Sequence, residues 1–61
     1  MKNNLKVILA LKEKTQRDLA NETGITESAI SKYIKDKRQP KYSNMVKIAN
    51  ALNIEVKEIW E

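Results

Sequence analysis

Cysteine, histidine and phenylalanine are absent from the chain, and glycine and proline occur once each. Without cysteine there is no disulfide framework, and without cysteine or histidine the usual zinc ligand sets cannot be assembled. A hydrophobic content of 41% with so little glycine and proline argues against a disordered chain. Because the aromatic residues are limited to Tyr33, Tyr42 and Trp60, the core must be mainly aliphatic. This composition favours packed helices over sheet.

Long apolar runs are also lacking. The segment 1–11 mixes lysine and asparagine with leucine, and it does not reach the length of a signal-sequence core or a membrane span. The 61 residues suffice for one domain, over 1–61, with one modest core, and are too few for a second domain. We therefore expect a single cytoplasmic domain that does not enter a membrane.

The positive charge is concentrated in one segment. Residues 32–41 hold five basic residues and one acidic residue. The net charge of this segment equals the formal net charge of the whole chain, +4, so the charges of the remaining residues cancel. A balanced protein with one basic segment is typical of a surface that binds a polyanion. A solvated charge cluster on an ordinary surface would give the same pattern.

About five helices are expected from the apolar spacing and the sparse turn residues. The first covers about residues 2–13, and its core-facing side is expected to hold Leu5, Ile8 and Leu9, widened by Val7 and Leu11. Thr15 is expected to cap the second helix, over 16–23, by accepting from the backbone N–H of Asp18. Gly24 follows, where a left-handed residue can end a helix without steric penalty.

Thr26 is the expected cap of a third helix, which runs from Glu27 to about Lys35. A loop over 36–41 follows, because Pro40 imposes extended backbone on the residue before it. Ser43 is the expected cap of a fourth helix, and a short fifth helix covers about 55–60. The expected core stripe of the fourth helix consists of Met45, Ile48, Ala49 and Leu52, with Val46 beside them.

The third helix has two unlike faces. At about 100° per residue, one face is apolar, and the other is small and cationic, with Ser28, Ser31, Lys32 and Lys35. A helix fits the major groove of B-DNA, where serine can bind several bases and lysine favours guanine. The connection from the second helix is about three residues long and contains a glycine, as in a helix-turn-helix.

An ordered set of short motifs resembles the phage repressor and Cro type of helix-turn-helix. The motifs cover nearly the whole chain, and their order and spacing carry the resemblance: 15–20, 24–26, 30–33, 38–40 and 48–52. The resemblance implies an all-α, five-helix bundle of the lambda-repressor-like type. It also implies a sequence-specific regulator of transcription, a repressor in the first instance, that binds double-stranded DNA as a homodimer on a two-fold operator, without a cofactor, metal or small-molecule ligand.

By position, the resemblance also implies roles for individual residues. The base-reading residues would be Glu27, Ser28, Ser31 and Lys32. The phosphate contacts would be Thr15, Gln16, Lys35, Lys37, Arg38, Lys41, Tyr42 and Ser43. Gln16 would donate to a phosphate from the N-terminus of the second helix, although a solvent-facing residue in a first turn would look the same.

The sequence departs from the family pattern at three places. Glu27 stands where relatives commonly carry glutamine. The glutamate either replaces an adenine contact with an acceptor suited to cytosine N4, or serves only as a charge at the helix start. Asp36 stands where a glycine often follows the recognition helix, and aspartate tolerates left-handed backbone at some strain. Glu13 and Lys14 replace the usual Gly-Leu before the second helix.

Two other functions are alternatives to DNA binding. An enzyme is disfavoured, because Ser28 with Lys32 is the sole pairing of a nucleophile with a base. A protein-interaction module, such as an antitoxin or adaptor domain that uses the last two helices, is the main alternative. Tyr33 is expected in the core, whereas Trp60 could complete the core or join a dimer interface whose candidates are Ile54, Val56, Ile59 and Trp60.

Overall fold

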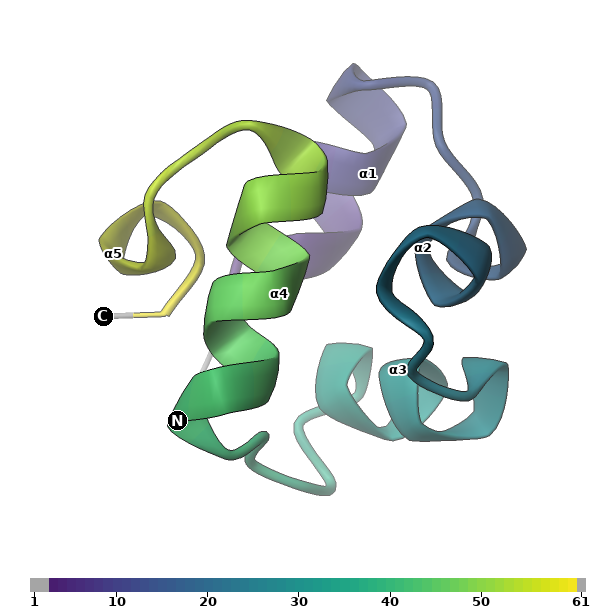
Figure 1. Cartoon of the computed structure of the whole chain (residues 1–61), viewed down its shortest axis with the longest axis vertical. Helices are drawn as coiled ribbons and strands as arrows, with labels where there is room; N and C mark the ends of the chain where they lie inside the picture. The colour runs from purple at the N-terminus through teal and green to yellow at the C-terminus, as the bar shows by residue number, and fades with distance from the viewer. Residues whose placement is uncertain (1–2, 61) are drawn as a thin grey trace.

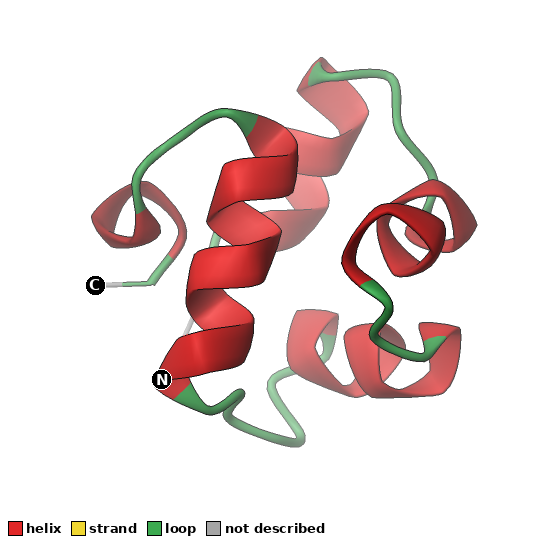
Figure 2. Ribbon diagram, viewed as in Figure 1, coloured by secondary structure: helices red, strands yellow, loops and turns green. Residues whose placement is uncertain are grey.

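The computed structural model describes residues 3–60, which form five helices joined by loops (Figures 1 and 2). The helices are α1 (Leu5–Leu11), α2 (Gln16–Thr23), α3 (Glu27–Ile34), α4 (Tyr42–Leu52) and α5 (Val56–Ile59). Helix α2 packs against α3 and α4, and α4 packs against α5. In Figure 1, α4 lies in the middle of the bundle, with α5 on one side and α2 and α3 on the other. The expected all-α, five-helix architecture is confirmed.

One aliphatic core joins the helices. Each helix contributes at least one residue with no more than 1% of its surface exposed: Leu5, Leu19, Ile30, Ile48, Leu52 and Ile59. Tyr33 and Trp60 are each 5% exposed and complete this core. The expectation that Tyr33 belongs to the core is confirmed, and the core interpretation of Trp60 holds within the isolated chain.

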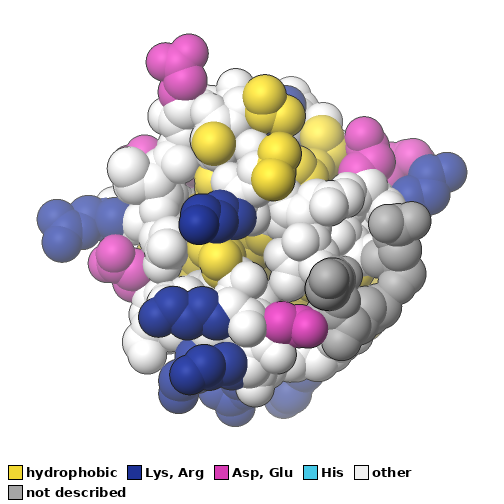
Figure 3. All heavy atoms as spheres, turned by 180° about the vertical axis from the view of Figure 1, so that it is seen from behind, with side chains coloured by type: hydrophobic (Ala, Val, Ile, Leu, Met, Phe, Trp, Pro, Cys, Tyr) yellow, Lys and Arg dark blue, Asp and Glu magenta, His cyan; other side chains and the backbone are white. Residues whose placement is uncertain are grey.

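Helix α1 is shorter than expected and its apolar side is narrower. The expected start at Lys2 lies outside the described residues, and at the other end Glu13 has a φ of 56°, which is incompatible with continued right-handed helix. Val7 and Leu11 are 60% and 77% exposed, so the prediction that they widen the core face is wrong. Hydrophobic side chains reach the surface in the upper part of Figure 3, where α1 faces the viewer.

The start of α4 also differs from the prediction. The expected cap, Ser43, lies inside the helix, because Lys41 occupies the N-cap position and makes no side-chain capping hydrogen bond. Pro40 is buried directly before it. The chain therefore enters α4 through a packed proline, a type of helix start that the hydroxyl pattern does not indicate. Among the described residues, the longest helices fall short of the length and apolar character needed to cross a membrane.

Candidate nucleic-acid interface

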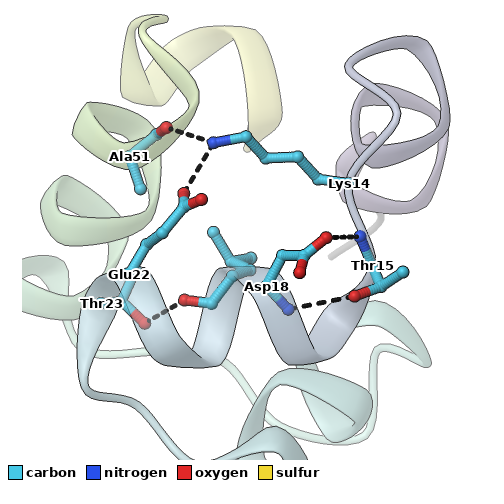
Figure 4. Close-up of polar contacts among 7 residues, drawn as sticks. Lys14, Thr15, Asp18, Glu22, Thr23 and Ala51 are labelled. Atoms are coloured by element: carbon cyan, nitrogen blue, oxygen red, sulfur yellow. Dashed lines mark hydrogen bonds and ion pairs between the residues drawn. The ribbon is translucent and has the colours of Figure 1, made fainter.

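The start of α2 is fixed by a reciprocal pair of hydrogen bonds (Figure 4). The backbone N–H of Asp18 donates to Thr15 Oγ1 over 3.0 Å, as expected, and the backbone N–H of Thr15 donates to Asp18 Oδ2 over 3.0 Å. The hydrogen bond from the Thr15 backbone N–H to the carboxylate lowers the pKa of Asp18 most, and the Thr15 side chain and the positive charge of Lys14 act in the same direction. The N-terminal turn that presents Gln16 is thus held in one geometry.

Lys14 ties the α1–α2 loop to the rest of the bundle. Its Nζ donates to Glu22 Oε1 over 2.6 Å and to the main-chain carbonyl of Ala51 over 3.2 Å, near the C-terminus of α4 (Figure 4). The side chain is 28% exposed, so part of its stem lies against protein. This connection across α2 and α4 was not predicted, because nothing in the sequence brings positions 14 and 51 together.

The turn between α2 and α3 follows the expected geometry. Gly24 has a φ of 77°, in the left-handed region, and ends α2. Thr26 caps α3, since its Oγ1 accepts from the backbone N–H of Ala29 over 3.1 Å. Glu27 therefore occupies the first position of α3, where its negative charge suits the positive end of the helix dipole.

The two faces of α3 separate as predicted. Ile30 is fully buried and Tyr33 nearly so, and the Tyr33 hydroxyl accepts a long, 3.4 Å hydrogen bond from Asn44 Nδ2 in α4. On the opposite face Ser28, Lys32 and Lys35 are exposed, and Ser31 is half-buried. The small and cationic face of α3 is therefore open, and the apolar face anchors it to the core.

The loop after α3 continues this surface. Asp36 adopts left-handed backbone with a φ of 58°, as expected, and the backbone N–H of Lys37 donates to the carbonyl of Lys32 over 2.9 Å. The side chains of Lys37, Arg38 and Lys41 are exposed beside the start of α4. In Figure 3, seen from behind, basic side chains gather over the lower left part of the molecule, in the region of α3 and this loop.

Two further expected phosphate contacts begin α4. Tyr42 is 71% exposed and Ser43 is also exposed. A hollow of about 580 Å³ lies between this helix start and the α2–α3 turn, and its basic lining residues are Arg38, Lys41 and Lys47. Thr15 at the start of α2 is exposed and Gln16 is half-buried. The expected contact residues thus come from three segments: the start of α2, α3 with its following loop, and the start of α4.

Arg17 is a residue of this surface that the sequence patterns did not single out. Its Nε lies 3.8 Å from Glu27 Oε1, across the turn that joins the two helices. Both side chains are largely exposed. The resemblance could have indicated this contact, since a helix-turn-helix brings the first turn of its first helix, here α2, close to the start of its second, here α3.

The four dimerisation candidates divide into two kinds. Ile59 is fully buried and Trp60 nearly so, which leaves little of either side chain for a partner in this conformation. Ile54 and Val56 are half-buried, and they line a groove of about 560 Å³ between α4 and α5 together with Tyr42, Val46 and Trp60. The groove, rather than the two buried residues, is the accessible apolar surface at this end of the bundle.

The sequence model of the helix-turn-helix family matches residues 5–59. The chain belongs to this helix-turn-helix family. A crystal structure of a candidate DNA-binding protein from Bacteroides fragilis is 38% identical, with a TM-score of 0.87, over 95% of this chain and 94% of that one. No curated protein matches the chain. The resemblance to the phage repressor and Cro type of helix-turn-helix is confirmed.

Within this helix-turn-helix protein, two of the departures from the family pattern carry a backbone cost. Glu13 and Asp36 both have positive φ, at 56° and 58°. A side chain at such a position is less favourable than glycine. The fold is therefore retained with acidic residues at two turns where glycine would be unstrained.

Proposed function

We propose that the chain is a sequence-specific regulator of transcription that binds double-stranded DNA in the cytoplasm and acts as a repressor. In this proposal α3 enters the major groove and reads bases with Glu27, Ser28, Ser31 and Lys32. The start of α2, the loop after α3 and the start of α4 bind backbone phosphates on either side. Membership of the helix-turn-helix family and the likeness to the Bacteroides fragilis protein support a DNA-binding role.

The main support for the proposal is that α3 has one buried face and one exposed face. Ile30 is fully buried, whereas Ser28 and Lys32 are exposed on the opposite side, next to the loop cations. A helix that enters the major groove of B-DNA needs a free face. From that face, short hydroxyls and a long cation can reach the base edges. Exposed cations in the loop after α3 and at the start of α4 supply the sequence-independent attraction to phosphate.

We further propose that two copies bind together on a two-fold operator. The groove between α4 and α5 is the surface that supports a homodimer, because it exposes parts of Ile54, Val56 and Tyr42. Two copies related by a two-fold axis would place two α3 helices in successive major grooves, about 34 Å apart. A selected site would then be palindromic.

Selection of bound duplexes from a random library tests the proposal directly. A two-fold motif, with half-sites about one helical turn apart, is expected. Binding to the selected site should also weaken by orders of magnitude between about 50 and 200 mM salt, because several phosphate contacts release counterions. Recovery of no motif, together with a flat salt dependence, would refute DNA reading by α3.

A protein-interaction module remains the second candidate function, and the same groove favours it. An antitoxin or adaptor domain would use α4 and α5 to hold another protein, with Val46, Ile54 and Val56 in contact with it. Apolar binding of this kind would lack the steep salt dependence. Salt titration of DNA binding therefore separates the two functions.

A further inference from the structure

The ion pair between Arg17 and Glu27 joins the two helices of the helix-turn-helix, on the side that faces DNA in the proposed function. Arg17 is the second residue of α2, and Glu27 is the first residue of α3. Arg17 Nε is 3.8 Å from Glu27 Oε1, and the side chains are 78% and 52% exposed. An exposed pair at this distance adds little to the stability of the fold. Its position suggests a role in binding rather than in folding.

A carboxylate at the start of α3 is in an unusual electrostatic position for the proposed function. Glu27 can accept a hydrogen bond from cytosine N4 in the major groove. The phosphates on both edges of the groove repel the same carboxylate. Without a nearby cation, a glutamate here would weaken binding to every sequence while it favours one base.

Arg17 supplies that cation from the neighbouring helix. Guanidinium carries five N–H donors in a rigid plane, and the contact with Glu27 is made from Nε. With 78% of the side chain exposed, the terminal nitrogens stay accessible to solvent. One face of the group can thus remain near the carboxylate while the other donates to a phosphate oxygen.

We propose that Arg17 is a specificity-determining residue, which holds the Glu27 carboxylate toward cytosine N4 and binds a backbone phosphate beside it. This inference rests on the proposed function and names the base that Glu27 reads. Arg17 acts on specificity through Glu27, so its effect must depend on that carboxylate. If Arg17 instead held Glu27 away from the groove, removal of the arginine would strengthen binding.

The test is selection of duplexes by four proteins: the native chain, Arg17→Ala, Glu27→Gln and the double variant. The native chain should recover cytosine at one position of each half-site, and Glu27→Gln should replace it with adenine. Arg17→Ala should lose about 10-fold of the native preference for cytosine at that position. In the double variant, the loss of Arg17 should leave the base preference of Glu27→Gln unchanged, because the carboxylate is gone.

Lys12→Ala is the matched control, because Lys12 is an exposed cation outside the helix-turn-helix. It should leave the preference for cytosine unchanged. Helical circular dichroism and the unfolding midpoint of Arg17→Ala should match the native chain, which rules out misfolding.

The possible failures are distinguishable. If the native chain recovers no motif, the proposed function fails and this inference with it. If the native chain recovers a motif but Arg17→Ala keeps the same preference or binds more tightly, the role of Arg17 alone is overturned. A loss of cytosine preference that is equally large in Lys12→Ala would also overturn it, since the effect would then be general charge.

Discussion

The side-chain amide of Asn3 donates to the main-chain carbonyl of Tyr33, with 2.8 Å between Nδ2 and the oxygen. The Oδ1 of the same amide accepts from the backbone N–H of Leu5 over 3.0 Å. The Tyr33 carbonyl lies in the last turn of α3, so a residue near the start of the chain supports the end of the proposed recognition helix. The backbone of Asn3 also pairs with that of Trp60.

Asn3→Ala should therefore destabilise the protein. The variant loses two part-buried hydrogen bonds, each worth about 0.5–1.5 kcal/mol, while the Tyr33 carbonyl keeps its hydrogen bond from the backbone N–H of Asp36. We expect the free energy of unfolding to fall by about 1–2 kcal/mol in urea titrations. Asn4→Ala is the matched control, because Asn4 Nδ2 makes one exposed, 3.2 Å bond to the carbonyl of Glu58. An equal loss in both variants would contradict the role given to Asn3.

Glu13→Gly should stabilise the protein. Glu13 has a φ of 56°, and left-handed backbone costs a non-glycine residue about 1–2 kcal/mol. Glycine removes that cost but loses about 0.4–1 kcal/mol through the greater freedom of the unfolded chain. The net gain should be about 0.5–1 kcal/mol, seen as a higher unfolding midpoint.

Gly24→Ala is the reverse experiment. Gly24 has a φ of 77°, and apart from Gly24 and its two chain neighbours no described residue has an atom within 4 Å of the place that a Cβ would take. The loss should come from backbone strain alone, at about 0.5–1.5 kcal/mol. If Glu13→Gly and Gly24→Ala both stabilised or both destabilised the protein, left-handed backbone would not be what determines the stability of these turns.

Much of the fold was predictable because it depends on local chemistry. The caps at Thr15 and Thr26 and the left-handed residue Gly24 are decided by contacts within four residues, and all three were confirmed. The prediction for the apolar face of α1 was wrong because that face depends on tertiary packing rather than on local contacts. Spacing cannot show that Val7 and Leu11 stay exposed, because that depends on where the other helices pack.

Less of the candidate site could be predicted. The two faces of α3 follow from its period, so the exposure of Ser28 and Lys32 was expected. The contacts of Arg17 with Glu27 and of Lys14 with Ala51 were not, because they join residues 10 and 37 positions apart. Pairs of this kind need the tertiary arrangement before either partner can be chosen.

The charge of Asp18 should make the stability of α2 depend on pH. Hydrogen bonds from Thr15 lower the pKa of Asp18 below the ordinary value of 3.8. A carboxylate with a lowered pKa stabilises the folded state at neutral pH, and this contribution is lost as the pH falls below about 4 toward the folded-state pKa. Asp18→Asn should thus unfold at a lower temperature than the native chain at pH 7. The two should converge in thermal unfolding as the pH falls below the folded-state pKa of Asp18, whereas a difference that persisted there would trace the effect to shape rather than charge.

Lys32 and Lys37 should differ in what they contribute to DNA binding. Lys32 extends from the open face of α3, whereas Lys37 lies in the loop, and both are exposed. Lys32→Ala should cost about 1–3 kcal/mol at particular base pairs and relax the preference there, because it removes a base contact. Lys37→Ala should weaken binding to all sequences alike and lower the salt slope by about 1, because it removes a phosphate contact. Titrations against the selected site and single-base variants of it, at several salt concentrations, measure both effects. Equal losses across every sequence in Lys32→Ala would assign Lys32 to the phosphates instead.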